Sequence, residues 1–416
     1  MRARIATPSS AAIRLILLLV AVTGVSQFFR ASAGVIAPEL MRDLHLGPET
    51  FGLAGSAFFV ALGVAQIPVG MLFDRVGPRL TVGVLTLVAV FGAALHAVAE
   101  SGAMLVAARA ILGLGSAASF MSVVVFCSRW FPRDRLSLTL SWVFSASQVG
   151  IFFATTPLAL ASEAIGWRWA FAAAAVATAL IGILFLWLVA DDPPGRAAPP
   201  RPHETLGQVV LGLLEVWRTP GLAKVLAVHT FIYASMVTVL GLWAGPYLLD
   251  VHGLDAVARG NVLFAMAAAQ VVGILCYGPL DRVFNTRKWI VVVGGAGTLA
   301  ALATLALVPG LGLAPAAALL VGLCAITSYS LVVVAHGRSL FPDRLAGRGV
   351  TTVNIAQVGG SAVLPILTGF IVAAVPEEGG ARPEIAYRLA FGAIALCLAA
   401  GLAVYLTAKD VKPRAS

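Results

Sequence analysis

Charged side chains are scarce in this chain of 416 residues. Lys, Arg, Asp and Glu together make up 11% of it, whereas 60% is hydrophobic, and the mean hydropathy is +0.95. A water-soluble protein needs roughly twice as much charge, about 25% of its residues, to cover its surface. The composition therefore excludes an ordinary soluble globular protein and indicates a chain that lies in a membrane.

Cysteine is also scarce, and its spacing fits neither a metal site nor a disulfide framework. The four cysteines lie in apolar stretches, where a free thiol behaves as a small apolar group: Cys127, Cys276, Cys324 and Cys397. The sequence likewise has no HExxH motif, no Walker phosphate loop and no nucleophile–base arrangement. We therefore predict no resident metal or cofactor, no ATP hydrolysis and no enzymatic activity.

Long apolar stretches, in contrast, are abundant. Each is long enough for a membrane-spanning helix of about 20 residues. The twelve stretches are 13–38, 50–72, 80–99, 102–128, 136–162, 168–190, 222–249, 257–280, 289–308, 312–337, 346–374 and 385–408. Backbone in lipid must satisfy its own hydrogen bonds, so each stretch is expected to be helical. The sequence predicts an all-α membrane protein with twelve transmembrane helices.

Positive charge is distributed unevenly between alternate loops. With a cytoplasmic N-terminus, 21 of the 28 Lys and Arg residues lie in cytoplasmic segments and 5 lie in outer loops. Lys and Arg accumulate on the cytoplasmic side of membrane proteins, so both termini are predicted to be cytoplasmic. This bias accounts for the net charge of +9 without binding to nucleic acid. The predicted location is the inner membrane of a bacterial-type cell.

One long polar connection lies at residues 191–221. It begins Asp-Asp-Pro-Pro-Gly-Arg-Ala-Ala-Pro-Pro-Arg-Pro, a composition that is incompatible with a helix. Apolar residues with helical spacing follow, namely Leu206, Val209, Val210, Leu213, Leu214 and Trp217. This pattern predicts an amphipathic helix that lies in the membrane interface, in contact with lipids.

The segments on either side of this linker repeat each other. In both, a Phe-Pro pair is followed by Gln-Val-Gly and then by a proline. The glutamine follows Pro132 by 16 residues and Pro342 by 15 residues, and the next proline follows the glutamine by 9 and 8 residues, respectively. An internal repeat of six helices is typical of transporters built from two bundles around a mid-membrane site. We therefore predict two pseudo-symmetric six-helix bundles, at 1–190 and 222–416, with the linker at 191–221 between them.

The loop after the second predicted helix carries the most specific motif, Gly-Met-Leu-Phe-Asp-Arg-Val-Gly-Pro-Arg. Its motif residues are Gly70, Asp74, Arg75, Gly77 and Arg79, and the second half repeats it in part at Asp281 and Arg282. The loop resembles the signature G-x-L-x-D-R-x-G-R-R of the major facilitator superfamily, with Pro78 in place of one Arg. The resemblance spans nearly the whole chain and implies alternating access, with this loop holding the bundles together in one state. The alternative is that its arginines only serve the charge bias of the loops.

Two arginines lie within predicted helices. Arg109 begins Arg-Ala-Ile-Leu-Gly-Leu-Gly, which resembles the fourth-helix motif R-x-x-x-G-x-G of the superfamily. The segment from Phe29 and Arg30 to Pro38 resembles D-R-x-x-x-x-V-A-A-P in the first helix of the anion:cation symporter branch of the superfamily. This branch and the nitrate/nitrite-porter-like bacterial branches are the ones that the chain resembles most. Phe29 occupies the position where members often carry Asp, so this chain lacks that carboxylate.

Arg30 and Arg109 are the candidate anion-binding residues. They lie roughly 12 Å and roughly 10 Å below the outer helix ends, and the resemblance implies that their helices line the central cavity. None of the 19 acidic residues lies near the middle of a predicted helix, so a carboxylate or phosphate-like substrate would neutralise these guanidinium groups. The alternative is that Arg109 binds only backbone carbonyls and glutamines within the N-terminal bundle.

Uncharged polar residues near the membrane midplane complete the candidate site. They are Gln27, Gln148, Tyr233, Gln270, Tyr329, Asn354 and Gln357. A hydrogen bond between helices explains each of them equally well. His229, in the seventh predicted helix, is the candidate proton carrier because imidazole titrates near neutral pH, and a structural role is its alternative.

Together these features predict a monomeric secondary transporter that takes up a small organic anion, driven by a co-transported proton or by exchange. A proton-coupled exporter of drugs or metabolites with the same fold is the main alternative. Such exporters carry Gly-x-x-x-Gly-Pro-x-x-Gly-Gly in the fifth helix, and the corresponding segment from Ser145 to Pro157 lacks it. A sensor or a membrane enzyme is disfavoured, because the longest non-membrane segment is the linker.

Overall fold

The computed structural model describes residues 10–193, 215–342 and 345–413. Twelve of its helical spans are long and apolar enough to cross a membrane, so the predicted all-α membrane fold is confirmed. The predicted interfacial helix falls almost entirely outside the described residues, which include only Trp217 of its apolar stripe.

The first six spans contain the helices α1 to α10. They are α1 (Ser10–Val35), α2 (Ala37–Asp43), α3 (Pro48–Arg75), α4 (Pro78–Ala97), α5 (Gly102–Ser116), α6 (Ser119–Trp130), α7 (Arg133–Ser147), α8 (Val149–Phe153), α9 (Thr156–Ile165) and α10 (Trp167–Leu188). Of these, α2 is a short helix between two spans, α5 with α6 forms the fourth span, and α7 to α9 form the fifth.

The last six spans follow the linker. Their helices are α12 (Leu222–Thr238), the π-helical turn η1 (Val239–Trp243), α13 (Ala244–Asp250), α14 (Ala256–Tyr277), α15 (Leu280–Val283), α16 (Lys288–Leu307), α17 (Leu313–Ile326), the 3₁₀ turn η2 (Thr327–Tyr329), α18 (Ser330–Ser339), α19 (Ala346–Ala373) and α20 (Glu384–Leu406). The seventh span combines α12, η1 and α13, and the tenth combines α17, η2 and α18.

Prolines account for several interruptions within these spans. Pro157 lies in the first turn of α9, two residues after Thr155. Thr155 has a non-helical backbone conformation, with φ −104° and ψ −118°. Pro246 follows the π-helical turn η1, where the missing N–H and the proline ring displace the preceding carbonyls. The fifth and seventh spans are therefore segmented helices, whereas other spans around the centre, such as α3 and α19, are continuous.

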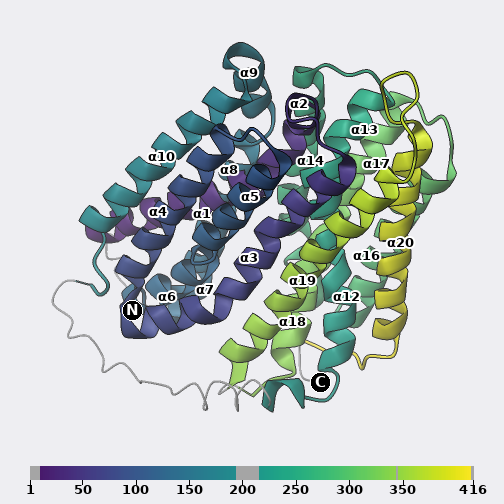
Figure 1. Ribbon diagram of the computed structural model, residues 1–416. Coiled ribbons are helices and arrows are strands. Elements are labelled where there is room, and N and C mark those ends of the chain that lie inside the picture. Colours follow the sequence, from purple (N-terminus) through teal and green to yellow (C-terminus); the bar gives the residue numbers. More distant parts are fainter. Residues whose placement is uncertain (1–9, 194–214, 343–344, 414–416) are drawn as a thin grey trace.

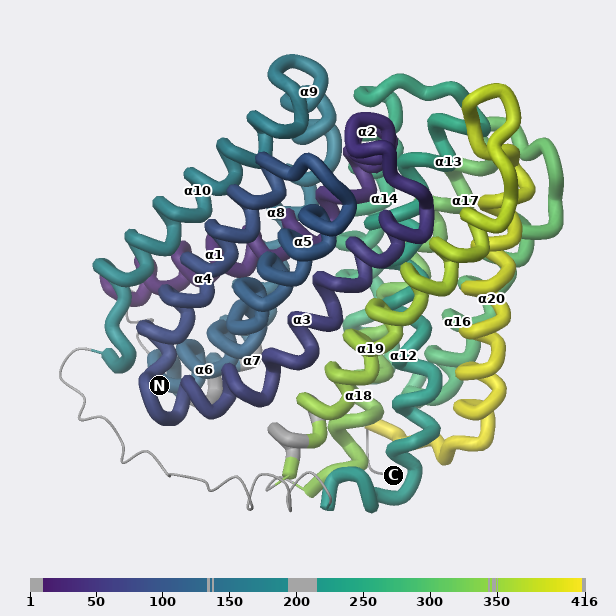
Figure 2. Tube along the Cα trace, viewed as in Figure 1, coloured from purple at the N-terminus to yellow at the C-terminus, as the bar shows by residue number. Residues whose placement is uncertain are grey.

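The two halves of the chain form two bundles that lie side by side. Figures 1 and 2 show α1 to α10 (purple to teal) in one bundle and α12 to α20 (teal to yellow) in the other. Across the boundary α3 packs against α19, α1 against η1, and α9 against α14. One end of the molecule carries α2, α9 and α13, and is called the α2 end below. The opposite end, where α12 begins and α20 ends, is called the α12 end (Figure 1).

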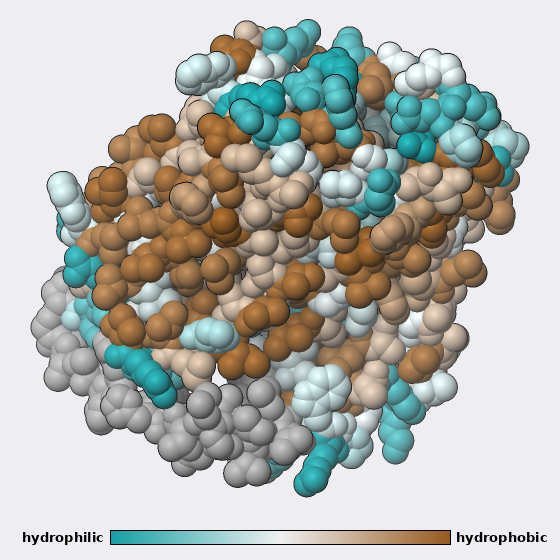
Figure 3. Space-filling view, in the orientation of Figure 1, coloured by the Kyte–Doolittle hydropathy of each residue, from teal (hydrophilic) through white to brown (hydrophobic). Residues whose placement is uncertain are grey.

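Apolar side chains cover the middle of the face of the molecule that Figure 3 shows. Figure 3 shows them between hydrophilic groups that gather at the α2 end and hydrophilic groups nearer the α12 end. Large apolar side chains such as Val64, Phe91 and Trp187 are exposed. An apolar surface of this extent is compatible with lipid and not with water. The chain is therefore a multi-pass membrane protein.

Equivalent carboxylates cap equivalent helices in the two bundles. Asp191 accepts a hydrogen bond from the backbone N–H of Arg79 at the start of α4 (2.7 Å). Asp410 accepts hydrogen bonds from the backbone N–H groups of Arg287 (3.1 Å) and Lys288 (3.0 Å) at the start of α16. Both carboxylates follow the last helix of their bundle and satisfy N–H groups that a helix leaves free. The pseudo-symmetry predicted from the sequence repeat thus extends to individual contacts.

Candidate functional site

A central cavity of about 470 Å³ lies between the two bundles. Its walls come from α1, α3 and α5 to α7 on one side and from α12, α14, η2, α18 and α19 on the other. Every one of these helices also packs within its own bundle, so relative motion of the bundles would change the shape of the cavity. A volume of this size is typical of sites for small molecules, which span about 300–1,000 Å³.

Arg30 is the one charged side chain among the described residues that line this cavity. It projects from α1, and its guanidinium lies 6.0 Å from the centroid of the Phe59 ring. The Nε atom is buried and has no hydrogen-bond partner within the described part of the chain. A guanidinium in this setting is available for a carboxylate or another planar anion, to which it donates paired hydrogen bonds.

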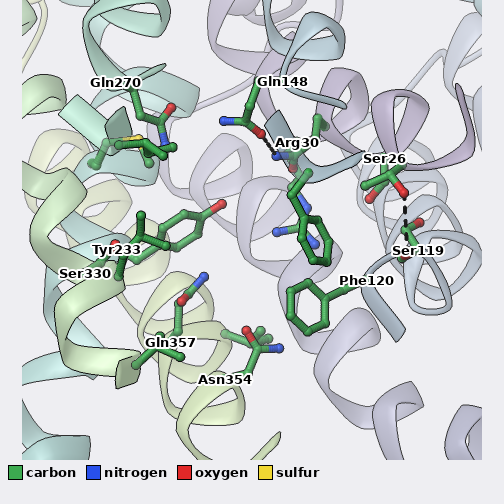
Figure 4. Close-up of a pocket in the computed structure, with 18 of the residues that line it drawn as sticks. Ser26, Arg30, Ser119, Phe120, Gln148, Tyr233, Gln270, Ser330, Asn354 and Gln357 are labelled. Atoms are coloured by element: carbon green, nitrogen blue, oxygen red, sulfur yellow. Dashed lines mark hydrogen bonds between the residues drawn. The ribbon is translucent and has the colours of Figure 1, made fainter. Parts of the chain in front are cut away.

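Amides and one phenol supply most of the predicted polar groups of the wall. Gln27 donates a hydrogen bond to Gln148 (2.5 Å), one helical turn from Arg30. Across the cavity from Arg30 lie Tyr233, Gln357 and Asn354 (Figure 4). Gln270, which also lines the cavity, completes the set. The site thus offers one fixed positive charge on the N-terminal bundle and uncharged donors and acceptors on both bundles.

The structure adds lining residues that the sequence did not single out. Ser26, Ser119 and Ser330 line the cavity, and so do Phe120 and Phe144, which stack with ring centroids 4.9 Å apart. Serines and phenylalanines are common in membrane helices, so neither type stands out as a signal in the sequence. Only the rotation of each helix about its axis reveals which of them face the cavity.

Arg109 lies outside the cavity, contrary to the prediction that it shares the anion site. Its side chain is 2% exposed, its Nη1 donates a hydrogen bond to the Phe29 carbonyl (2.6 Å), and its guanidinium lies 5.0 Å from the centroid of the Phe58 ring. The depth of Arg109 was estimated from its position along the helix, but the helix turns this side chain into the N-terminal bundle. The alternative reading, binding to a backbone carbonyl, describes its position in this structure.

Tyr329 and His229 also lie outside the cavity lining. Tyr329 is buried in the C-terminal bundle, where its ring packs against Gly294 and faces Tyr277. His229 is 0% exposed and is not among the described lining residues. Both residues are therefore buried on helix faces that point into the bundle. In this conformation neither is placed to contact a molecule in the cavity.

The bundles close the cavity at the α2 end. On α1 the lining residues Gln27 and Arg30 precede Gly34, which contacts the backbone of Gly241 and Gly245 in the other bundle. On α19 the lining residue Gln357 precedes Pro365. These small residues let backbones approach closely, because a side chain would not fit between them.

On the helices that run in the opposite direction, the residues of the close contacts come first in the sequence and the lining residues follow. The close contacts therefore again lie on the α2 side of the cavity. Gly52 of α3 contacts Pro365 and precedes the lining residue Gln66, and Arg259 of α14 precedes Gln270. Arg259 donates to Glu39 of α2 across the bundle boundary (2.5 Å). These contacts form one layer between the cavity and the α2 end, which we call the α2-end seal. It consists of Gly34, Glu39, Gly52, Gly241, Gly245, Arg259 and Pro365. The lining residues extend from the seal toward the α12 end.

The motif loop between α3 and α4 lies at the α12 end. Gly77 has φ +103°, a backbone conformation that glycine adopts without steric cost. Arg79 donates through Nε to the Leu186 carbonyl (2.8 Å). In the second bundle Asp281 pairs with Arg287 (3.4 Å), while Arg282 is exposed. These partners of Arg79 and Asp281 each belong to the same bundle as the residue they bind, so these contacts stabilise the individual bundles.

Within the described residues, no group of three or more His, Cys, Asp or Glu side chains has an arrangement that could hold a metal ion. The cavity wall is built from Arg30, amides, hydroxyls, aromatic rings and aliphatic side chains. Such a wall can bind and orient a small solute by charge and hydrogen bonding.

The family model of the Major Facilitator Superfamily matches residues 19–336. The chain belongs to this superfamily. Members of the Major Facilitator Superfamily are membrane transporters and not enzymes, and the twelve spans described above agree with that membership. The resemblance drawn from the sequence motifs is therefore confirmed.

Several relatives of this superfamily member are named for anions. A putative tartrate transporter of Agrobacterium vitis is 23% identical over 367 residues, which cover 82% of this chain and 80% of the relative. A D-galactonate transporter of Escherichia coli is 26% identical over 60% of this chain and 62% of the relative. A nitrate/nitrite transporter of Nostoc punctiforme is 28% identical over 38% of this chain and 33% of the relative.

Solved structures of superfamily members have the same fold. A bacterial homologue of the human lysosomal transporter Spinster, in an inward-facing and unoccupied conformation, matches with a TM-score of 0.77 and 16% identity over 96% of this chain and 97% of that chain. A D-xylose–proton symporter matches with a TM-score of 0.73 and 13% identity over 96% and 98%. At these identities the likeness concerns the fold alone.

Proposed function

We propose that this protein takes up a small organic anion across the bacterial inner membrane by alternating access. The observation that carries the proposal is the guanidinium of Arg30, whose Nε has no hydrogen-bond partner among the described residues, in the wall of a central cavity that has no described acidic lining residue. An unpaired charge is costly inside a membrane protein and usually serves a substrate or an ion. The names of the relatives, which refer to tartrate, D-galactonate and nitrate or nitrite, support an anionic substrate.

The proposed binding mode divides the substrate between the bundles. Arg30 holds the carboxylate from the N-terminal bundle, while Tyr233, Gln357 and Asn354 face the rest of the molecule from the C-terminal bundle (Figure 4). The bundles at 1–190 and 222–416 then rock about the substrate, with the linker 191–221 joining them on the cytoplasmic side. With both termini cytoplasmic, the α2-end seal faces outward and the conformation described here is open toward the cytoplasm.

The exporter alternative receives less support from the cavity. Many drugs are cations or are uncharged and apolar, and a cation would be repelled by Arg30, which has no described carboxylate in the cavity to offset its charge. Uptake is proposed because the fifth span, α7 to α9, also lacks the glycine-rich exporter motif.

The test is a thermal-shift titration of the purified protein with D-galactonate, tartrate, nitrate and phosphate, followed by transport of the best ligand in proteoliposomes. Loss of one charged hydrogen-bonding group in Arg30→Ala is expected to weaken binding by about 10- to 100-fold, and Arg30→Lys should retain part of it. Arg42→Ala is the control, because the Arg42 side chain is 78% exposed outside the cavity. Transport by Arg30→Ala at the wild-type rate would refute the anion site.

A further inference from the structure

The charge of the empty cavity has a consequence for the transport cycle. Arg30 is the one charged group among the described lining residues, and a guanidinium stays protonated at every physiological pH. The other polar lining groups are amides, hydroxyls and the phenol of Tyr233. The empty site therefore carries a single positive charge that no described neighbour in the cavity neutralises.

Among the described residues, no carboxyl or imidazole group lines the cavity itself. The residue before Arg30 is Phe29, whose side chain is buried and whose carbonyl accepts the hydrogen bond from Arg109 (2.6 Å). A carbonyl oxygen holds that bond without gaining or losing a proton, so the contact is the same across the physiological pH range. His229 and His96 are both 0% exposed and are not among the described lining residues. His229 lies behind the wall beside the lining residue Gln357, which separates it from the cavity. His96 stacks on Phe171 instead, with ring centroids 3.9 Å apart.

From this arrangement we propose that the carrier exchanges one monovalent anion for another across the membrane and does not couple uptake to protons. A bound monovalent anion makes the site at Arg30 electrically neutral. The empty site must instead carry its unpaired guanidinium through a closed state from which water is excluded, where such a charge is strongly disfavoured. The loaded carrier changes conformation readily, whereas the empty carrier returns slowly and waits for a second anion.

The same charge balance sets the valence of the substrate. A divalent anion would leave one negative charge uncompensated in front of the amides and the phenol, so the loaded carrier would again be charged during the conformational change. Monovalent anions should therefore exchange faster than divalent ones of similar size. This inference rests on the proposed anion site at Arg30, and adds to it the mode of transport and the charge of the substrate.

The experiment uses the full-length protein in proteoliposomes with a labelled monovalent anion. This anion is D-galactonate, or nitrate if the thermal-shift test shows that nitrate stabilises the wild type but not Arg30→Ala. Uptake into vesicles that contain the same unlabelled anion should exceed uptake into vesicles without it by about 100-fold. Exchange should also be unaffected by an imposed membrane potential or pH gradient, because one negative charge moves in each direction.

The outcomes separate the two proposals. A ratio of exchange to net uptake below about 10, or net uptake accelerated by an inward proton gradient, would overturn exchange while leaving the anion site intact. If no anion of the panel stabilises the protein in a way that depends on Arg30, the proposed function fails and the exchange mechanism fails with it. Exchange of tartrate as fast as that of the monovalent anion would overturn the inferred valence.

A substitution in the cavity tests the charge itself. Gln27 lies one turn before Arg30 and lines the cavity, so Gln27→Glu places a carboxylate beside the guanidinium without changing the size of the side chain. The carboxylate should neutralise the empty site, raise net uptake by about 10-fold or more, and weaken anion binding. If Gln27→Glu weakens anion binding but leaves the ratio of exchange to net uptake unchanged, the charge of the empty site does not limit the return of the empty carrier.

Discussion

Glu39 and Arg259 form an ion pair that joins the two bundles directly above the cavity. The Nη2 atom of Arg259 lies 2.5 Å from a carboxylate oxygen of Glu39, and the two side chains are 3% and 20% exposed. Glu39 belongs to α2, which follows the helix that carries Arg30, and Arg259 belongs to α14, which also carries Gln270. The pair therefore connects the α2-end seal to helices that form the cavity wall.

The first prediction concerns this pair. Glu39→Gln should open the α2 end, because breaking a largely buried ion pair leaves the guanidinium of Arg259 without its counter-charge. A loss of about 1.4–2.8 kcal/mol would increase the open fraction by about 10- to 100-fold. Ser56→Cys, in a protein whose native cysteines are replaced by alanine, reports the opening, because Ser56 is buried beneath the seal and donates to the Ala362 carbonyl of α19.

The measurement is the rate at which a membrane-impermeant thiol reagent labels the thiol introduced by Ser56→Cys in right-side-out vesicles. The control is Arg42→Gln, which breaks an exposed ion pair with Asp43 inside one bundle and should leave the rate unchanged. Equal labelling with and without the Glu39→Gln change would mean that the pair does not hold the seal closed.

A second prediction follows from the position of Arg109. This residue holds the Phe29 carbonyl immediately before Arg30, so Arg109→Met should shift Arg30 and weaken anion binding by about 10-fold through the loss of a charged hydrogen bond. It should also lower the thermal unfolding temperature without ligand, whereas Arg30→Ala should not. Arg109→Lys, which keeps the charge and a donor, should recover part of both effects. If Arg109→Met abolished binding with an unchanged unfolding temperature, direct contact with the anion would be the better explanation.

Arg30 and Arg109 also illustrate how far the sequence predicts the site. Their depths follow from counting residues along a helix of known rise, and the twelve spans follow from apolar length alone. The direction of each side chain about the helix axis does not, since spans that are apolar on every face carry little information about which face points inward. Arg30, Gln27 and Gln357 line the cavity, whereas Arg109, Tyr329 and His229 are buried and are not among its described lining residues.

The α2-end seal could not be predicted from the sequence for a different reason. Glu39 and Arg259 are 220 residues apart and lie near helix ends, where single charges are expected in any membrane protein. Their contact depends on which conformation brings the bundles together at that end, and residue patterns within one helix do not specify this. Gly34 and Gly245 likewise have no sequence signal beyond the frequency of glycine in membrane helices.

The third prediction uses two glycines of α1 as a matched pair. A Cβ atom at position 34 would lie 2.5 Å from the carbonyl carbon of Gly241, whereas one at position 24 would lie 3.6 Å from the Ser147 carbonyl oxygen, an ordinary contact. Gly34→Ala should therefore prevent tight closure of the α2 end, increase labelling of the thiol introduced by Ser56→Cys, and slow transport by about 10-fold or more. Gly24→Ala should change neither. Wild-type transport by Gly34→Ala would show that this backbone contact is dispensable.

The last prediction concerns Asp410, beyond the end of α20. Burial alone would raise the pKa of this carboxyl, but hydrogen bonds from the Thr286 hydroxyl and from the backbone N–H groups of Lys288 and Arg287 outweigh it and hold the pKa below its ordinary value. A carboxyl whose pKa is lower in the folded state stabilises the fold above its unfolded pKa, and this contribution is lost as the pH falls through the folded value.

Asp410→Asn should therefore lower the unfolding free energy at pH 7 by about 0.5–2 kcal/mol, as expected for a weakened helix cap. The difference from wild type should shrink as the pH is lowered from about 6 toward and below about 4, where the wild-type carboxyl also becomes protonated. Thermal unfolding of the detergent-solubilised proteins across this range measures both effects, and Asp255→Asn, which changes a carboxylate that caps α14 at the α2 end, provides a comparison from the opposite side of the membrane. A difference between Asp410→Asn and wild type that stayed constant with pH would mean that the charge of Asp410 does not contribute to the cap.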